Sequence, residues 1–286
     1  MYKNYSILMS VYKDEKPEEV KQSIDSMLNQ SLKADQFVLV EDGPLTDELY
    51  SLIAEYERNN PNLFTIVELE TNIGLGKALD KGIEYCKNEL IARMDADDIS
   101  MTERCQKQVQ LFNSNSELDV VGTFIDEFYD EPKNIVSKRV VPVDHADIVS
   151  FMRKRSPFNH PTVMYKKSAV LNAGGYGKMR RKQDLDLFSR MINNGAQTAN
   201  IPESLLLFRS NEDNFKRRNS WDYCKSYIEV QYAIWKRGHC SFFDLAYVVI
   251  GQTVLYVAPI PVLKWLSNRF LREKNKEIVS SKGNKS

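Results

Sequence analysis

The sequence predicts an α/β protein whose core is a doubly wound, mostly parallel sheet. Short apolar runs alternate with amphipathic helical segments in a βαβαβαβ order over about the first 95 residues. Several of these runs end in polar side chains, at the positions where parallel strands present their carboxyl ends to a ligand. The fourth run, at 90–92, leads directly into Asp95, Asp97 and Asp98. Together these features indicate an open sheet with a binding crevice along one edge.

The first half of the chain supplies the parallel strands and the helices between them. The runs 5–12, 37–40, 64–68 and 90–92 are mostly apolar, as buried parallel strands are. The helix expected at 17–28 begins with Pro17, which suits a first helical turn, and it carries one apolar face. Thr46 can cap a helix at 47–56, and a third helix opens at Gly74 and continues to Cys86.

The second half is less regular. We expect helices at 101–113, 146–153 and 183–192, and strands at 120–125, 162–165, 198–201 and 205–208. His160 lies in a loop at 157–161, and a glycine-rich turn at 174–177 precedes the basic residues 178–182. Asp184 lies in the first turn of the helix 183–192, where an acid either complements the helix dipole or faces a ligand. A basic segment at 209–218 closes the globular part.

Four polar strand ends are expected to meet in the crevice. They are Tyr12-Lys13-Asp14, Glu41-Asp42, the loop from Asn72 to Gly76, and the acids from Asp95 to Asp98. Any one of them alone reads as a turn, but four at corresponding places favour a binding site. Clustered carboxylates repel one another unless a cation lies among them, and hard oxygen ligands suit Mg²⁺ or Mn²⁺.

Composition narrows the class of protein. The chain has 286 residues, 42% of them hydrophobic and 27% charged, which is ordinary for a globular protein. Its formal net charge is zero, so the totals do not indicate a nucleic-acid partner. Its four cysteines are far apart with no C-x-x-C pair, which predicts unpaired thiols in a reducing compartment and no zinc site. Since no secretory signal precedes the first strand, we expect a cytoplasmic protein.

The C-terminal part has a different character. Residues 242–258 are apolar, but the run is shorter than a membrane-spanning helix needs, and Pro259 and Pro261 interrupt it. From Lys264 onward seven Lys or Arg stand against two acids. This pattern predicts a helix lying on an anionic membrane surface. The alternative is a helical pair that packs on the domain or forms a dimer interface.

Eight short motifs follow one another along the chain. They are Ser10-Val11-Tyr12, Glu41-Asp42-Gly43, Asn72-Ile73-Gly74-Leu75, Ala92-Arg93-Met94-Asp95-Ala96-Asp97-Asp98, His160-Pro161-Thr162-Val163-Met164, Ala173-Gly174-Gly175-Tyr176, Gln183-Asp184-Leu185-Asp186-Leu187 and Phe208-Arg209. In this order they resemble the family 2 glycosyltransferases of bacterial capsule, O-antigen and exopolysaccharide biosynthesis, which have the GT-A fold. The resemblance implies a GT-A domain at 1–218, with a nucleotide-binding half at 1–100 and an acceptor-binding half at 101–218. A helical, membrane-associating extension at 219–286 would follow.

The resemblance also implies roles for individual residues. Asp184 would be the general base that deprotonates the acceptor hydroxyl, and Asp97 would hold a divalent metal, Mn²⁺ or Mg²⁺. The residues implied to contact the nucleotide sugar are Val11, Tyr12, Glu41, Asp42, Asn72, Gly74, Arg93, Asp95, Ala96, Arg217 and Arg218. His160 is either a contact to the diphosphate or acceptor, or a hydrogen-bonded loop histidine. Two positions depart from the family pattern: Glu41 stands where Asp is usual, and Gln183, a candidate acceptor contact, stands where Glu is usual.

The activity that the resemblance implies is inverting, metal-dependent sugar transfer. A hexose or N-acetylhexosamine would move from a UDP-sugar donor to a glycan linked to a lipid diphosphate, such as undecaprenyl diphosphate. The enzyme would be peripheral on the inner face of the cell membrane. Two other functions remain open: a non-catalytic glycan-binding or scaffold relative, suggested by Gln183, and a nucleotidyltransferase that makes sugar nucleotides. The latter usually has a glycine-rich, Arg-containing loop after its first strand, where this chain has Tyr12-Lys13-Asp14-Glu15.

Overall fold

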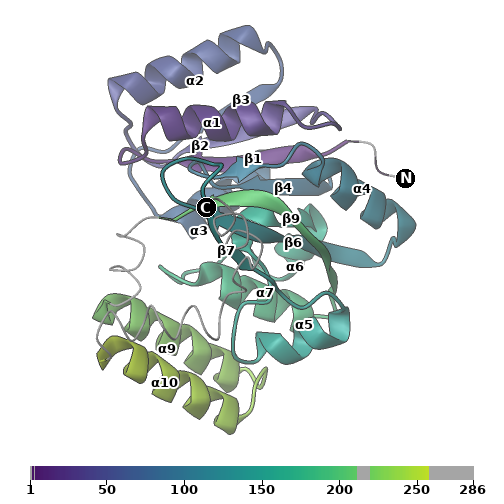
Figure 1. Ribbon diagram of the computed structural model, residues 1–286, viewed down its shortest axis with the longest axis vertical. Coiled ribbons are helices and arrows are strands. Elements are labelled where there is room, and N and C mark those ends of the chain that lie inside the picture. The colour runs from purple at the N-terminus through teal and green to yellow at the C-terminus, as the bar shows by residue number, and fades with distance from the viewer. Residues whose placement is uncertain (1, 3, 211–219, 258–286) are drawn as a thin grey trace, which may run out of the picture.

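The computed structural model describes residues 2, 4–210 and 220–257 (Figure 1). Two predicted site residues, Arg217 and Arg218, lie outside these residues, as do Pro259, Pro261 and the basic run that begins at Lys264.

The described strands form one nine-stranded mixed sheet in the order β3-β2-β1-β4-β8-β6-β9-β5, with β7 paired to β6. Their bounds are β1 Ser6–Val11, β2 Gln36–Glu41, β3 Phe64–Glu68, β4 Leu90–Met94, β5 Ile99–Ser100, β6 Leu118–Phe128, β7 Ile135–Arg139, β8 Met164–Lys166 and β9 Gln197–Arg209. Strands β3, β2, β1 and β4 are parallel neighbours, as the alternating pattern of the first half predicts. The short β8 runs antiparallel to both β4 and β6, and joins the two halves of the sheet.

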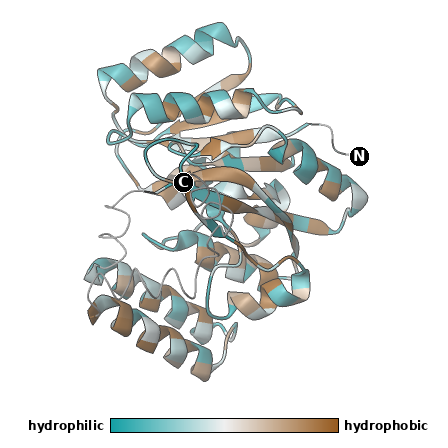
Figure 2. Ribbon diagram, in the orientation of Figure 1, coloured by the Kyte–Doolittle hydropathy of each residue, from teal (hydrophilic) through white to brown (hydrophobic). Residues whose placement is uncertain are grey.

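Helices cover both faces of this sheet (Figure 1). Their bounds are α1 Pro17–Leu28, α2 Asp47–Asn59, α3 Leu75–Tyr85, α4 Arg104–Ser114, α5 His145–Met152, α6 Lys167–Asn172, α7 Gln183–Asn193, α9 Trp221–Lys236 and α10 Phe242–Val257, with a 3-10 turn at His160–Thr162. One core lies under α1, α2 and α4, and the other under α3, α7 and the C-terminal helices. Successive residues of one strand supply both cores, since Phe37 and Leu39 belong to the first and Val38 and Val40 to the second. Figure 2 shows the hydrophobic residues gathered along the strands. The predicted doubly wound α/β fold is therefore confirmed.

The second half differs from the sequence prediction in three places. The strands expected at 198–201 and 205–208 are one strand, β9, which pairs in parallel with β6. The register shifts between Thr123 and Phe124 of β6, opposite Ile201 and Ser204, and this irregularity absorbs the interruption at Pro202. The strand expected from Thr162 begins at Met164, because residues 160–162 form the 3-10 turn. The short elements β5, β7 and α6 were not predicted.

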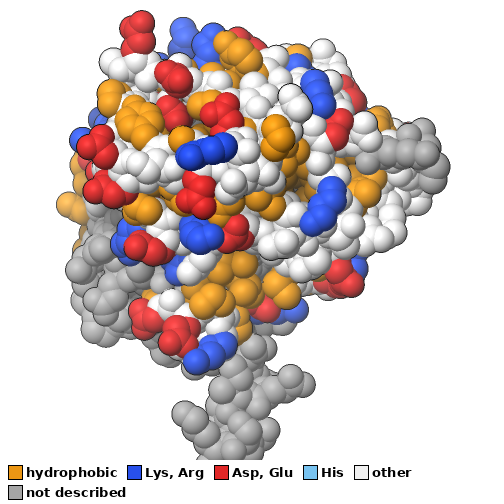
Figure 3. Space-filling view, turned by 90° about the horizontal axis from the view of Figure 1, so that it is seen from above, with side chains coloured by type: hydrophobic (Ala, Val, Ile, Leu, Met, Phe, Trp, Pro, Cys, Tyr) orange, Lys and Arg blue, Asp and Glu red, His pale blue; other side chains and the backbone are white. Residues whose placement is uncertain are grey.

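The C-terminal helices α9 and α10 form an antiparallel pair that packs on α7 (Figure 1). Ser220 caps α9 by accepting a hydrogen bond from the Tyr223 amide at 3.3 Å. Among the described residues no helix has the length and apolar character needed to cross a bilayer. All four cysteines are buried and unpaired, as their spacing predicts. On the face seen in Figure 3, acidic and basic side chains are interspersed rather than gathered by sign.

Candidate functional site

The carboxyl ends of β1, β2 and β4 lie at one edge of the sheet, because the three strands are parallel neighbours. Val11, the last residue of β1, is paired with Glu41, the last residue of β2. Val11 is buried, and its carbonyl accepts a hydrogen bond from the Asp42 amide at 2.8 Å, whereas the side chain of Tyr12 is exposed. Three of the four polar segments that the sequence predicted to converge, those after β1, β2 and β4, therefore follow neighbouring strand ends.

Asp42 organises the loop that leads into α3. Its Oδ1 accepts a hydrogen bond from the Ile73 amide at 2.7 Å, and its Oδ2 accepts one from the Gly74 amide at 3.1 Å. The Asn72 side chain donates to the Asp42 carbonyl at 3.1 Å. Gly43 has a positive φ, and a Cβ there would lie 2.5 Å from the Asn72 nitrogen, so only glycine fits. Asp42, Asn72 and Gly74 thus form one unit, with both Asp42 carboxylate oxygens held by backbone amides.

Glu41 is buried at the end of β2, next to Glu68 on β3. Burial raises the pKa of Glu41, and the charges of Glu68 and Glu57 raise it further. The carboxyl of Glu41 therefore retains a proton to higher pH than an exposed glutamate would.

The three acids after β4 form a cluster. Asp95, Asp97 and Asp98 each contribute a carboxylate oxygen to a group in which these atoms all lie within 4.8 Å of one another. Burial and the charge of Asp95 raise the pKa of Asp97 to about 6, and burial together with Asp97 raises the pKa of Asp98 well above its usual range. One oxygen of Asp98 accepts a hydrogen bond from the Arg209 amide at 2.9 Å, whereas the other is buried without a hydrogen-bond partner in the described part of the chain. Crowded, desolvated carboxylates of this kind fit a hard divalent cation such as Mn²⁺ or Mg²⁺.

Glu15 is a further acid near the cluster, and it was not among the residues predicted from the sequence. Burial raises its pKa to about 8, and the charges of Asp97 and Asp95 are the next largest causes of the rise. The loop after β1 thus brings a further carboxyl group towards the acidic cluster. The available signal was its position in Tyr12-Lys13-Asp14-Glu15, directly after a strand whose end was expected in the crevice.

Two arginines lie against the acids. Arg93 of β4 is fully buried and forms an ion pair with Asp95, and its Nε and Nη1 atoms have no hydrogen-bond partner among the residues described. Arg209 of β9 donates from Nε to the Asp97 carbonyl at 2.9 Å and from Nη2 to Gln22 at 2.7 Å. Guanidinium groups beside a cation site suit the oxygens of a diphosphate.

His160 lies in a hydrogen-bonded group of aromatic residues. Its Nε2 is 2.8 Å from the Tyr176 hydroxyl, which is 3.4 Å from the hydroxyl of Tyr165. Burial lowers the pKa of His160 well below its usual value, and the charge of Arg93 adds to this effect. The imidazole is therefore neutral near pH 7. This contact matches one of the two interpretations of His160, that of a hydrogen-bonded loop histidine, and its contact with a ligand stays a prediction.

The first turn of α7 lies against the start of α3. The Gln183 side chain packs on Gly76, where an added Cβ would lie 3.0 Å from the Gln183 Cγ. Gln183 is buried and Asp184 is partly exposed. Burial raises the pKa values of Tyr176 and Tyr227, and the charge of Asp184 contributes to both rises, so Asp184 lies near these two rings. Asp184 therefore follows directly after a residue that packs on the first turn of α3.

Asp80 of α3 fixes the glycine-rich turn that precedes α7. Its carboxylate accepts hydrogen bonds from the amides of Tyr176 at 2.6 Å and Gly177 at 3.3 Å. A Cβ on Gly175, which has a φ of +67°, would overlap this carboxylate. The turn therefore joins α3 to the helix that carries Asp184.

This contact predicts that Gly175→Ala is much more destabilising than Gly195→Ala. Both glycines have positive φ, so both substitutions impose backbone strain, but nothing lies within 4 Å of a Cβ at Gly195. We expect a loss of about 1 kcal/mol for Gly195→Ala and about 3 kcal/mol for Gly175→Ala. Urea unfolding of the two variants measures the difference. Equal losses would show that the Asp80 carboxylate moves aside without cost.

The pKa of Asp97 predicts a pH dependence of stability for the metal-free protein. The folded protein retains a proton on Asp97 up to about pH 6, whereas the unfolded chain releases it near the ordinary value of 3.8. Stability should therefore fall as the pH rises through this window, by about 2 kcal/mol after allowance for partial exposure. Thermal unfolding in a chelator at stepped pH measures this fall, and Asp97→Asn, which cannot titrate, should reduce it. An unchanged pH dependence in Asp97→Asn would assign the effect to other groups.

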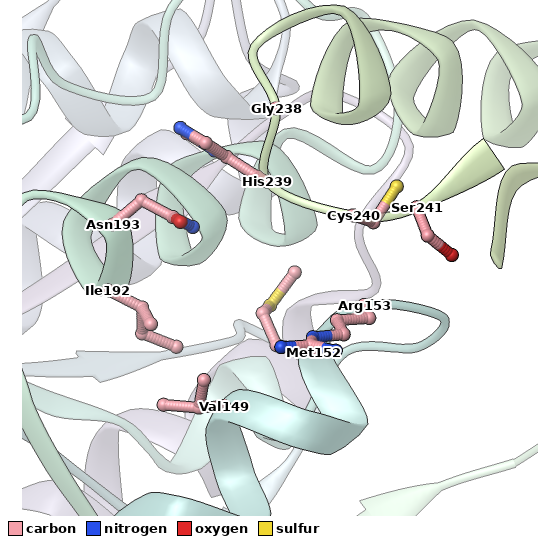
Figure 4. Close-up of a pocket in the computed structure, with 9 residues that line it drawn as sticks. All are labelled: Val149, Met152, Arg153, Ile192, Asn193, Gly238, His239, Cys240 and Ser241. Carbon is pink, nitrogen blue, oxygen red and sulfur yellow. The ribbon is translucent and has the colours of Figure 1, made fainter.

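A cavity of about 340 Å³ lies away from the acids, at the other end of α7. Figure 4 shows its lining residues, which come from α5, from the end of α7 and from the turn between α9 and α10. Ile192 and Asn193 are the last two residues of α7, whereas Asp184 lies in its first turn. The helix rise separates Asp184 from Ile192 by roughly 12 Å. The cavity marks where the C-terminal helices pack on the domain and is not part of the acidic site.

Comparison with known proteins identifies the family to which the chain is similar. The sequence profile of Glycosyl transferase family 2 matches residues 6–188. The chain is 34% identical to the amylovoran biosynthesis glycosyltransferase AmsE of Erwinia amylovora, over 92% of this chain and 97% of that protein. It is 30% identical to the UDP-Gal:alpha-D-GlcNAc-diphosphoundecaprenol beta-1,3-galactosyltransferase of Escherichia coli, over 94% of this chain and 96% of that protein.

Solved structures agree on the fold. The mannosyltransferase PcManGT from Pyrobaculum calidifontis, solved with GDP-Man and Mn²⁺, superposes with a TM-score of 0.63 at 14% identity, covering 99% of this chain and 76% of that one. Residues 1–349 of S. aureus TarS, solved with UDP, superpose with a TM-score of 0.57 at 15% identity, covering 79% of this chain and 65% of that one. The chain therefore belongs to glycosyl transferase family 2: it is a glycosyltransferase with the GT-A fold.

Proposed function

We propose that this glycosyltransferase is an inverting, metal-dependent enzyme of bacterial surface polysaccharide biosynthesis. It moves a hexose or N-acetylhexosamine from a UDP-sugar to a glycan carried on a lipid diphosphate. The observation that carries the proposal is the position of Tyr176 between two charged groups: Arg93, which pairs with Asp95 of the carboxylate cluster, and Asp184 in the first turn of α7 both act on its hydroxyl. A donor diphosphate and an acceptor hydroxyl need these two kinds of group on opposite sides of the transferred sugar.

The donor side rests on the acids and arginines at the edge of the sheet. Asp97, supported by Asp95 and Asp98, would hold Mn²⁺ or Mg²⁺, which when bound neutralises charge on the departing diphosphate. Arg93, which is fully buried and pairs with Asp95, would add positive charge beside the phosphate oxygens. The base and ribose would lie along Val11, Tyr12 and Glu41. Arg217 and Arg218 would complete the diphosphate contacts.

The choice of nucleotide has support from relatives. The named substrate of the Escherichia coli relative is a UDP-sugar, and TarS was solved with UDP. PcManGT, which shares the fold at lower identity, was solved with a GDP-sugar, so the fold alone does not select the base.

Asp184 is the general base of the proposed reaction. Its carboxylate takes the proton of the acceptor hydroxyl as the acceptor oxygen forms a bond to the anomeric carbon of the donor sugar. The bond from that carbon to the diphosphate breaks in the same displacement, and its electron pair leaves with UDP. One displacement inverts the anomeric centre and needs no covalent enzyme intermediate.

The acceptor is proposed to be lipid-linked, as the name of the Escherichia coli relative states for that enzyme. Gln183 and His160 would lie on the acceptor side of the transferred sugar. The catalytic domain would comprise residues 1–218, and the extension at 219–286 would keep the enzyme peripheral on the inner face of the cell membrane.

A panel assay tests the proposal. The enzyme is incubated with Mn²⁺, one UDP-hexose or UDP-N-acetylhexosamine at a time, and a short-chain lipid diphosphate carrying one sugar. We expect transfer from at least one donor, with the configuration of the new linkage, read by nuclear magnetic resonance, inverted relative to the donor. A retained configuration would exclude the single displacement, and pyrophosphate release from a nucleoside triphosphate would favour a nucleotidyltransferase.

A further inference from the structure

Helix α10 presents an apolar stripe to solvent. The stripe comprises Phe243, Tyr247, Ile250, Val254 and Val257, whose exposed fractions lie between 51% and 82%. These positions are spaced alternately by four and three residues, so they lie on one side of the helix. Figure 2 shows hydrophobic residues along much of α10. Contiguous exposed apolar surface of this kind marks an interaction site.

The opposite side of α10 is already covered. Leu245 and Val248 are buried, and Val248 belongs to the core that includes Val230 and Ile234 of α9. The helix is thus apolar around most of its circumference, but the residues that the structure describes cover only one side of it. A helix of this composition is stable in water only if another apolar medium or surface meets its second side.

We propose that the stripe of α10 is the surface by which the protein lies on an anionic lipid bilayer. Aromatic residues such as Phe243 and Tyr247 suit the boundary between headgroups and acyl chains. Among the described residues no helix is long and apolar enough to span the bilayer, so contact would be with one leaflet only.

Basic residues lie beside the stripe, although one of them is paired with an acid. The Lys154 Nζ lies 5.3 Å from the centroid of the Tyr247 ring and 3.3 Å from an Asp244 oxygen, and Arg153 beside it is exposed. The sequence that follows α10 carries seven Lys or Arg against two acids from Lys264 onward. Basic residues next to an apolar helix face complement the negative surface of an anionic leaflet, whereas a second copy of this chain would bring like charges together.

The lipid-bound stripe would also orient the active site. Three contacts join the C-terminal helices to α7. The Lys182 Nζ lies 4.5 Å and 5.0 Å from the ring centroids of Tyr223 and Tyr227, Arg237 pairs with Asp186 at 2.5 Å, and His239 is hydrogen-bonded to Ser189 at 3.0 Å. Because α7 begins with the residues that include Asp184, a protein docked by α10 holds its acceptor side at a fixed position relative to the bilayer. The docking surface specifies how the extension proposed above would keep the enzyme on the membrane, and this last step also rests on the proposed role of Asp184.

Vesicle co-sedimentation tests the docking surface with the full-length protein. We expect it to bind phosphatidylcholine vesicles that contain phosphatidylglycerol, and to bind pure phosphatidylcholine vesicles at least about tenfold more weakly. The double substitution Phe243→Ser and Ile250→Ser should lower binding to the anionic vesicles by at least about tenfold. The matched control replaces Tyr85 and Leu171 by Ser, since these residues are also about half exposed but lie on α3 and α6.

Each outcome has one meaning. Loss of vesicle binding in the stripe variant alone, with unchanged thermal unfolding, supports the proposal. Equal binding by the stripe variant and the wild type, or equal loss in the control, overturns it. A dimeric wild type that becomes monomeric on substitution, with no vesicle binding by either, would assign the stripe to contact between copies and also overturn it. UDP binding measured on the same samples keeps the donor site separate, because its absence would count against the proposed function and not against the docking surface.

Discussion

Replacement of Asp184 by Asn is expected to lower the turnover number by about a thousandfold while UDP binding stays within about twofold of the wild type. The substitution keeps the size of the side chain and removes the group that accepts the acceptor proton, and general base catalysis contributes effects of this size. Asp184 lies in the first turn of α7 beside Tyr176 and Tyr227 rather than in the acidic cluster. Initial rates at saturating donor and acceptor, with UDP calorimetry on the same protein, measure both quantities.

The matched control is Asp222→Asn. Asp222 is exposed and lies in the first turn of α9, so this substitution removes the same helix-dipole interaction without touching the proposed site. Turnover by Asp222→Asn should equal that of the wild type. Normal turnover by Asp184→Asn would move the base to another residue. A wild-type protein that binds glycan but turns over no donor would favour a scaffold relative.

The second large effect is expected at the acidic cluster. Asp97→Ala should weaken UDP binding in Mn²⁺ by about a hundredfold and remove most of the difference between binding with and without the ion. Burial and the charge of Asp95 raise the pKa of Asp97 to about 6, which means that its charged form is unfavourable in the metal-free protein. A cation among these carboxylates offsets their repulsion and desolvation. Calorimetric titration with UDP, with Mn²⁺ or with a chelator, measures the change directly and needs no acceptor.

Two further measurements separate metal binding from general loss of structure. Electron paramagnetic resonance should show more free Mn²⁺ in the presence of Asp97→Ala than of the wild type at equal concentrations. Asp147→Ala, which removes an exposed acid of α5, should leave both Mn²⁺ and UDP binding unchanged. Ion-independent UDP binding by the wild type would contradict the metal assignment, even if Asp97→Ala lowered it.

The parallel half of the fold could be predicted from sequence because its strands are local apolar runs with sharp polar ends. The acids after β4 could also be predicted, because residues that are consecutive in one loop lie close together in any fold. The role of Asp42 was not predictable, because its partners are the backbone amides of Ile73 and Gly74, which no sequence pattern identifies. The contact from Asp80 to the turn before α7 was missed because it joins segments about a hundred residues apart, which only the tertiary fold brings together.

The strands and helices of the second half were harder to predict from the sequence, again because tertiary contacts determine them. Pro202 in β9 reads as the end of one strand, yet the strand continues because β6 accommodates it by a shift in register. The elements β5, β7 and α6 span between two and six residues, which is too short for a hydrophobic period to emerge. The role of His160 could not be decided from the sequence, which left two interpretations. Only the structure identifies the Tyr176 hydroxyl as its hydrogen-bonded partner.

The ion pair between Asp186 and Arg237 makes the stability of α7 depend on the C-terminal helices. Asp186 is buried and has two cationic partners, Arg190 on its own helix and Arg237 after α9. A protein truncated after β9 would lose the second cation, and it would uncover the core residues of α7 that Val230 and Ile234 now shield. We therefore expect the C-terminal helices to unfold together with α7 and its core, and a protein that ends after β9 to be less stable and more prone to aggregate than the full chain.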